Sequence, residues 1–165
     1  MERGSCVSSS DELNDALDEA QSGAVIKICD GDYKKFRFKM KTENVTVEAV
    51  THGRVSMHDS SYMEMQGYGN TFAGVVYHGG GSTTPLKLRG EANTIYNCVI
   101  EHHDADTWVE MKGKYNILRN CRFSEKTAHS GDPGREDQQL VEFISREDYR
   151  KGCIQGDNGP FPSKE

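Results

Sequence analysis

Basic side chains between residues 112 and 129 have the type and spacing that suit binding of an anionic ligand. Arg122, Lys126 and His129 follow one another at intervals of four and three residues, and they are preceded by Lys112, Lys114 and Arg119. A turn just past Phe123 would present Lys126 and His129 to an anionic ligand. The alternative is an ordinary solvated face. The sequence predicts substrate binding by Arg122, Lys126 and His129 and assigns no catalytic residue.

Two other runs resemble cofactor sites only superficially. His102-His103-Asp104-Ala105-Asp106 supplies metal-ligand types, but it falls between two repeats and has no partner at ligand spacing elsewhere. Gly79-Gly80-Gly81 lacks the lysine and the following helix of a phosphate loop. We therefore predict no metal site and no cofactor in this chain.

Composition excludes several classes of partner. The chain has 26 acidic and 20 basic residues, a net charge of -6, which argues against neutralising nucleic-acid phosphates. No window approaches the roughly 18 apolar residues of a membrane span, and the start lacks the apolar core of a signal peptide. We predict no nucleic-acid partner, no membrane partner and no export signal.

The five cysteines are odd in number and include no C-x-x-C pair. They therefore indicate neither a zinc site nor a closed disulfide framework, and we expect buried free thiols.

An internal repeat predicts the fold. From Tyr62, three segments superimpose at a constant offset of 23 residues, aligning Gly67, Gly90 and Gly113. The other aligned columns are Asn70, Asn93 and Asn116; Phe72, Ile95 and Leu118; Val75, Cys98 and Cys121; Tyr77, Ile100 and Phe123; Met63, Leu86 and Val109; and Met65, Leu88 and Met111. Polar residues alternate with these apolar ones, which is typical of strands.

Each 23-residue unit is predicted to hold two short strands separated by a bend at glycine. Stacking the units at roughly 4.8 Å would turn each apolar column into a continuous stripe inside a coil. Outside, Glu64, Lys87 and Glu110 would alternate in sign, and Asn97 and Asn120 would bond their amides along the coil. We predict an all-β parallel β-helix, a single-stranded solenoid.

A helix is predicted ahead of the strands, over residues 9–22. Ser9 or Ser10 can cap it, Gly23 can end it, and the apolar residues that recur at helical spacing are Leu13, Ala16, Leu17 and Ala20. Such a helix would cover the exposed edge of the first turn.

The repeat weakens towards the C-terminus. A further copy would place glycine, asparagine and cysteine where Glu136, Gln139 and Ile144 stand, although residues 140–144 still suit a strand. Residues 146–165 are polar and rich in glycine and proline. We predict a β-helix domain over 1–145, a disordered tail over 146–165, and end-to-end self-association through the uncovered last turn.

One segment resembles a known family. Residues 113–127, GKYNILRNCRFSEKT, with Gly131 shortly after, look like the G-K-x-N-x-V-x-x-C-x-F-x-x-K-T segment of family 6 polysaccharide lyases, the chondroitinase B and alginate lyase type. Asn93 to Ile100 is similar to that family's preceding turn, and Ser10 to Tyr33 is similar to its opening helix, strand and D-G-x-Y turn. The resemblance covers residues 8–131 and implies a right-handed parallel β-helix.

The resemblance also implies an activity. Family enzymes cleave uronate-containing polysaccharides, alginate or glycosaminoglycans such as dermatan sulfate, by β-elimination, and they are typically secreted or periplasmic. Calcium, held by asparagine and glutamate, neutralises the uronate carboxylate, a lysine removes the C5 proton, and an arginine helps protonate the leaving oxygen. In the family those residues lie beyond the matched segment, so calcium is expected only in full-length enzymes.

Three functions remain open at this stage. The chain is a lyase or a piece of one whose catalytic turns are missing, a non-catalytic binder of acidic glycans, or a purely structural β-helix. Glycan binding without elimination would favour the second.

Overall fold

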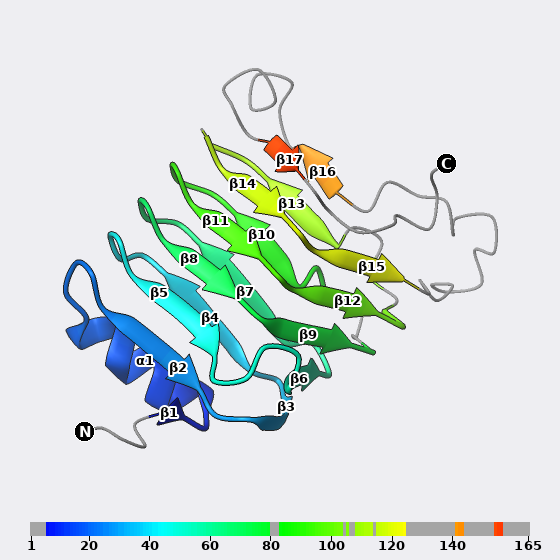
Figure 1. Cartoon of the computed structure of the whole chain (residues 1–165), viewed down its shortest axis with the longest axis horizontal. Coiled ribbons are helices and arrows are strands. Elements are labelled where there is room, and N and C mark those ends of the chain that lie inside the picture. The colour runs from blue at the N-terminus through cyan, green and yellow to red at the C-terminus, as the bar shows by residue number, and fades with distance from the viewer. Residues whose placement is uncertain are drawn as a thin grey trace.

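The computed structural model describes residues 6–79, 83–103, 105, 108–113, 115–124, 141–143 and 154–156. Short strands coil about a common axis (Figure 1). Helix α1 (Ser10–Glu19) and β1 (Cys6–Val7) lie at one end, and the other end holds β15 (Arg122–Ser124), β16 (Val141–Phe143) and β17 (Ile154–Gly156). No helix in these ranges is long and apolar enough to cross a membrane.

The strands form three parallel sheets, here called A, B and C. Sheet A contains β1, β2 (Val25–Ile28), β5 (Thr46–Ala49), β8 (Thr71–Ala73), β11 (Thr94–Tyr96), β14 (Ile117–Arg119) and β17. Sheet B contains β3 (Gly31–Lys34), β6 (Val55–His58), β9 (Val75–His78), β12 (Val99–Glu101) and β15. Sheet C contains β4 (Arg37–Met40), β7 (Tyr62–Met65), β10 (Leu86–Leu88), β13 (Val109–Met111) and β16.

Strand register follows the 23-residue repeat. Leu86 pairs with Met63 on one side and with Val109 on the other, and Ile95 pairs with Phe72 and Leu118. The described members of each apolar column therefore form a stripe of buried side chains, as the sequence predicted. The molecule is a right-handed parallel β-helix, and this prediction is confirmed.

Each turn of the coil contains three strands, so the prediction of two was wrong. The additional corner falls at Gly74, Asn97 and Asn120, whose φ angles are 83°, 58° and 54°. These left-handed residues turn the chain between sheets A and B without interrupting the apolar pattern. The predicted amide ladder is present here, because Asn120 Nδ2 donates to Asn97 Oδ1.

A second asparagine ladder lies inside the corner between sheets C and A. Asn70, Asn93 and Asn116 are fully buried. The backbone N–H of Asn70 donates to Asn93 Oδ1 at 2.9 Å, and the N–H of Asn93 donates to Asn116 Oδ1 at 3.0 Å. Each side chain thus satisfies backbone groups that a corner would otherwise leave unpaired.

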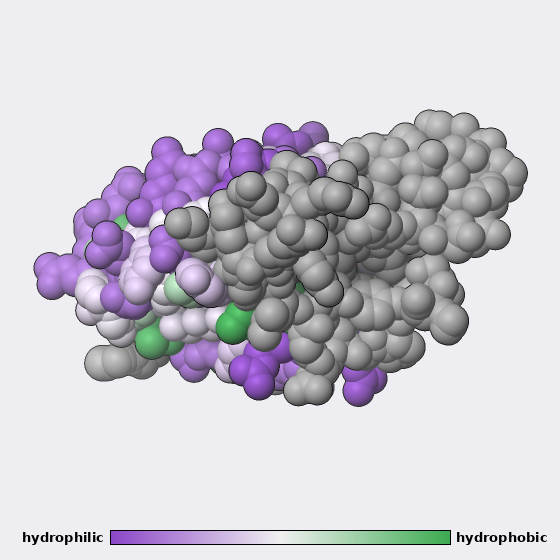
Figure 2. Space-filling model, turned by 90° about the horizontal axis from the view of Figure 1, so that it is seen from above, coloured by the Kyte–Doolittle hydropathy of each residue, from purple (hydrophilic) through white to green (hydrophobic). Residues whose placement is uncertain are grey.

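Apolar residues fill the inside of the coil, including Phe72, Leu86 and Trp108, which are fully buried. On the surface seen in Figure 2, the residues coloured by hydropathy are mostly hydrophilic, and the hydrophobic ones among them are isolated. The stacked interior therefore forms one hydrophobic core.

Helix α1 covers the first turn, as predicted, but it is shorter than the predicted range 9–22. Ser9 is its N-cap and accepts a hydrogen bond from Glu12 N at 3.1 Å, and the helix ends at the C-cap Ala20. Leu13 and Leu17 are buried in the core cluster, and α1 packs on β4. Gly23, with φ 94°, lies in the following turn rather than at the helix end.

The expectation of free thiols was wrong for two cysteines. Cys6 and Cys29 form a disulfide that ties β1 to the residue after β2. Cys98 and Cys121 are buried and not disulfide-bonded, as predicted, and burial raises the pKa of the Cys98 thiol well above its ordinary value. The disulfide therefore fixes the start of the chain to the first turn.

Two strands lie near the predicted end of the domain. β16 falls within the run 140–144 and pairs with β13, which confirms that strand. β17 falls within the predicted tail 146–165 and pairs with β14, which the sequence did not indicate. The rest of that segment lies outside the described residues.

Candidate functional site

The outer face of sheet C carries a concentration of positive charge. Phe38, Met63 and Leu86 point into the core, so the alternate positions of their strands point outward. The outward residues and those directly following these strands include the cations Arg37, Lys39, Lys41, Lys87, Arg89 and Lys112 and the carboxylates Glu64 and Glu110. On β4, β7, β10 and β13 and directly after them, six cations against two carboxylates make this face basic, although the chain carries a net charge of -6.

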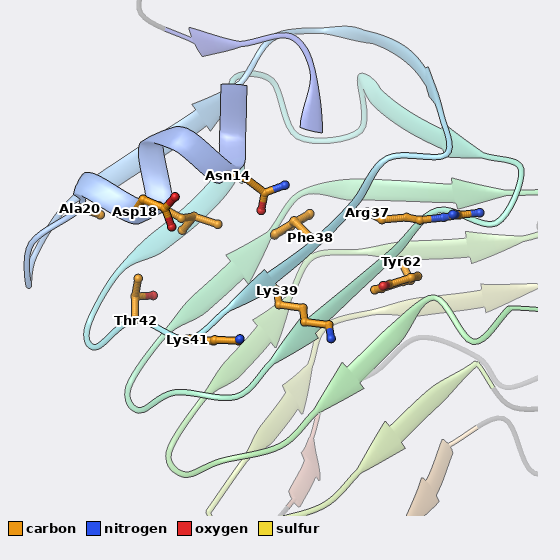
Figure 3. Close-up of a pocket in the computed structure, with 10 residues that line it drawn as sticks. Asn14, Asp18, Ala20, Arg37, Phe38, Lys39, Lys41, Thr42 and Tyr62 are labelled. Carbon is orange, nitrogen blue, oxygen red and sulfur yellow. The ribbon is translucent and has the colours of Figure 1, made fainter. Parts of the chain in front are cut away.

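A hollow of about 600 Å³ opens where this face meets α1. Figure 3 shows Arg37, Lys39 and Lys41 on β4 and its continuation, with Asn14 and Asp18 facing them from α1. Tyr62, the register partner of Arg37 on β7, forms part of the same wall. The hollow is therefore lined by three cations, the carboxylate of Asp18 and the aromatic residues Phe38 and Tyr62.

Three groups at this end are not neutralised. Within the described part of the chain, no carboxylate forms an ion pair with Arg37, Lys39 or Lys41. Arg37 Nε donates to Ser60 O at 2.9 Å, which holds the guanidinium beside Tyr62. These cations are available to an external anion.

The predicted charge alternation of Glu64, Lys87 and Glu110 is present in register, but its ion pairs are made by another residue. Arg89 lies 2.9 Å from Glu110 Oε1 and 3.8 Å from Glu64 Oε2. Lys87 Nζ instead lies 5.6 Å from the centroid of the Tyr62 ring. Arg89 is thus largely neutralised, and Lys87 adds its charge to the aromatic part of the face.

We call Arg37, Lys39, Lys41, Tyr62, Lys87 and Lys112 the basic face of sheet C. Arg37, Lys39 and Lys41 are spaced along β4 and just past its end, because alternate residues of a strand share one side, roughly 6.6 Å apart. The sequence reasoning missed this face. The alternation of basic and apolar residues in RFKMK, residues 37–41, was the available signal.

Of the predicted site residues Arg122, Lys126 and His129, only Arg122 lies within the described part of the chain. Arg122 is exposed on β15 of sheet B, Arg119 is exposed on β14 of sheet A, and Lys112 follows β13 of sheet C. Lys126, His129 and Lys114 lie outside the described residues. Corners of the coil separate the cations that the sequence grouped around one turn, and a binding role for Arg122, Lys126 and His129 stays a prediction.

The histidine run at residues 102–103 divides between the surface and the core. His103 is buried, and its ring lies 6.0 Å from that of Trp108. His102 is exposed, and its ring lies 4.9 Å from that of His78, which in turn lies 5.7 Å from that of His58. His102 and His103, which directly follow β12, thus point in opposite directions, His102 to the surface and His103 to the interior.

The described residues do not fit the calcium that the resemblance implies for full-length enzymes. Calcium requires six to eight oxygen ligands, several of them carboxylates. Glu64 and Glu110 on sheet C are taken up by Arg89, and no group of three or more His, Cys, Asp or Glu side chains within the described ranges could hold a metal ion. No step is therefore assigned to a metal here.

Comparison with known families decides the relationship. The family described as Chondroitinase B matches residues 7–133. The chain belongs to the chondroitinase B family. No curated protein matches the sequence.

Solved structures share the fold of this chondroitinase B family member. An alginate lyase of family PL6 in complex with a trisaccharide is 20% identical, with a TM-score of 0.62, over 73% of this chain and 28% of that one. A mutant of the PL6 alginate lyase AlyGC is 14% identical, with a TM-score of 0.60, over 84% and 23%. A PL6 polysaccharide lyase from Pseudopedobacter saltans is 15% identical, with a TM-score of 0.52, over 94% and 46%.

The chondroitinase B family member therefore spans less than half the length of each of these lyases. At these identities the comparison shows the fold alone. The family relationship and the basic face of sheet C are independent observations.

Proposed function

We propose that the basic face of sheet C binds a uronate-containing polysaccharide such as alginate or dermatan sulfate. The observation that carries the proposal is the row Arg37, Lys39 and Lys41, unpaired among the described residues and adjacent to Tyr62. A polyuronate presents one carboxylate on each sugar ring, and a row of cations on one strand can contact successive carboxylates. Tyr62 offers an apolar surface for the C–H groups of a ring.

Electrostatics supports this choice of ligand. Most of the surface of an acidic chain repels a polyanion, so a local excess of cations determines where such a polymer is held. The attraction acts over roughly 8 Å at physiological ionic strength and falls as salt is added. Binding should accordingly weaken steeply with salt.

We further propose that this face binds substrate without performing the elimination. In that reaction a base removes the C5 proton, the C4–O bond breaks, and the leaving oxygen is protonated as a C4–C5 double bond forms. The uronate carboxylate must be neutralised first, and the described residues group no metal ligands near the basic face. The chain then contributes binding turns to the lyase fold.

The test compares two charge-matched variants. Lys39→Ala/Lys41→Ala removes two cations from the basic face, and Lys34→Ala/Arg54→Ala removes two exposed cations near sheet B. Exposed ion pairs contribute about 0.2–1 kcal/mol each, so the first variant should weaken binding of alginate by about 2- to 30-fold. The second should change it by less than about twofold.

Two results would overturn the first part of the proposal, and a third would overturn the second part. Equal losses in the two variants, or equal binding of alginate and a neutral glucan by the unmodified chain, would exclude a specific site on sheet C. Formation of unsaturated uronate by the purified folded chain would show that it also carries an elimination site, against the second part.

A further inference from the structure

A second hollow, of about 630 Å³, lies on the outer face of sheet A. The residues that line it are Thr71, Thr94, Tyr96, Arg119 and Asn120. None belongs to the basic face of sheet C, and the two hollows are on different sheets of the coil. Any ligand here would be held independently of the first site.

The register of sheet A explains why a hollow forms. Tyr96 on β11 pairs with Ala73 on one side and with Arg119 on the other, and Thr94 pairs with Thr71. The side chains of Ala73, Thr71 and Thr94 are short. A depression therefore forms on the sheet surface beside the longer side chains of Tyr96 and Arg119. The floor is lined by hydroxyl groups rather than by charge.

Tyr96 is held in place from one side. The His52 ring lies 6.2 Å from the Tyr96 ring in an edge-on arrangement. His52 Nε2 is 3.1 Å from Glu48 Oε1, and His52 Nδ1 is 3.0 Å from Asn97 Nδ2. The tyrosine ring is therefore oriented before any ligand arrives, which lowers the entropic cost of binding.

Arg119 supplies the charge. Its side chain is exposed, and no carboxylate within the described ranges forms an ion pair with it. A guanidinium beside an aromatic ring can pair with a carboxylate in bidentate fashion while the ring contacts apolar atoms of the same ligand. That combination suits an anionic sugar.

We infer that this hollow is a second binding site for a hexuronate unit of an acidic polysaccharide. Tyr96 stacks on the C–H face of the pyranose, and Arg119 pairs with the carboxylate. Thr71 and Thr94 hydroxyls and the Asn120 amide oxygen bond the sugar hydroxyls. The inference shares its ligand class with the proposed function, but it concerns other residues.

Two sites on different sheets would make the chain bivalent. A polymer bound at one face would raise the effective concentration of uronate at the other, or two polymer chains would be held together. The affinity for polymeric alginate would then exceed the affinity for a short oligosaccharide. The difference between the two affinities would be larger than a single binding site can produce.

The experiment is calorimetric titration with a tetrasaccharide of uronates and with a neutral glucose tetrasaccharide. Tyr96→Ala and Arg119→Gln should each weaken one of two uronate sites by about tenfold. Tyr96→Phe, which keeps the ring, should bind within about twofold of the unmodified chain. Tyr68→Ala and Arg54→Gln remove an exposed tyrosine and an exposed arginine elsewhere and should leave both sites unchanged.

A background with Lys39→Ala/Lys41→Ala separates this inference from the proposed function. There the site on sheet A should bind as in the unmodified chain, and adding Tyr96→Ala should weaken it by about tenfold. If Tyr96→Ala and Arg119→Gln bind both equivalents as the unmodified chain does, the inference is wrong. If the background binds as the unmodified chain does while Tyr96→Ala weakens one site, the inference stands and the proposal for sheet C fails.

Discussion

Asn93 offers the sharpest test of how the coil is held together. Its fully buried side chain joins two turns: Oδ1 accepts from Asn70 N at 2.9 Å and Nδ2 donates to Gly67 O at 3.1 Å on the preceding turn, and Nδ2 also donates to Arg89 O at 2.8 Å on its own turn. In Asn93→Ala, a buried N–H left without an acceptor costs about 1–3 kcal/mol, and two lost bonds cost about 1 kcal/mol each. We expect the free energy of unfolding to fall by about 3–5 kcal/mol.

Urea unfolding followed by circular dichroism measures this loss. Asn14→Ala on the surface of α1 is the control and should change the free energy of unfolding by less than about 0.5 kcal/mol. Because repeat structures can open locally, amide exchange at Asn70 provides a second measurement and should accelerate in Asn93→Ala. A loss below about 1 kcal/mol with unchanged exchange at Asn70 would refute the role of the buried ladder.

Three further predictions follow from other contacts. Replacing Cys6 and Cys29 by serine removes a cross-link with a sequence separation of 23 and should lower the free energy of unfolding by about 3 kcal/mol, measured by urea titration of the oxidised chain and the variant; equal midpoints would contradict this. Gly90→Ala places a Cβ 2.2 Å from a backbone oxygen at φ 85° and should cost at least about 2 kcal/mol in thermal unfolding, whereas Gly53→Ala, with open space at a similar φ, should cost less. Burial alone would raise the pKa of Glu48, but hydrogen bonds from His52 and Lys27 outweigh it and lower that pKa. The stabilisation by Glu48 is therefore present above its unfolded pKa and is lost as pH falls through the folded one, so Glu48→Gln should destabilise the chain at neutral pH and not in acid; a loss independent of pH would exclude this.

The repeat predicted the fold because in a solenoid each turn contacts only its neighbours, so sequence offset and strand register are the same quantity. The columns of Leu86 and Ile95 could therefore be paired by counting residues alone. The number of strands in each turn could not be predicted in this way, because a left-handed residue such as Asn97 changes the chain direction within an unbroken apolar pattern.

The disulfide was missed because an odd number of cysteines was taken as a sign of free thiols. Cys6 and Cys29 are separated by 23 residues, the same offset as the repeat. The first strands pair at a different offset, Cys6 with Lys27 and Val25 with Thr46, so the 23-residue repeat does not extend upstream of Tyr62 and could not have indicated this cross-link.

The candidate site was only partly predictable. Basic residues near Arg122 were grouped by their proximity in sequence, but corners of the coil send Arg119 and Arg122 to different sheets. The basic face of sheet C depends on alternation within β4 and on α1 packing beside it, and only the first of these is visible in the sequence. The sequence thus predicts polyanion binding as a class but not its place on the surface.

The central claim is that an acidic polysaccharide is held on the basic face of sheet C. The most direct measurement is nuclear magnetic resonance mapping of the isotope-labelled chain during titration with a uronate oligosaccharide. The account predicts shifts concentrated at Arg37, Lys39, Lys41 and Tyr62, with exposed cations near sheet B such as Lys34 and Arg54 unaffected. Absence of shifts on sheet C, with a folded spectrum, would contradict it.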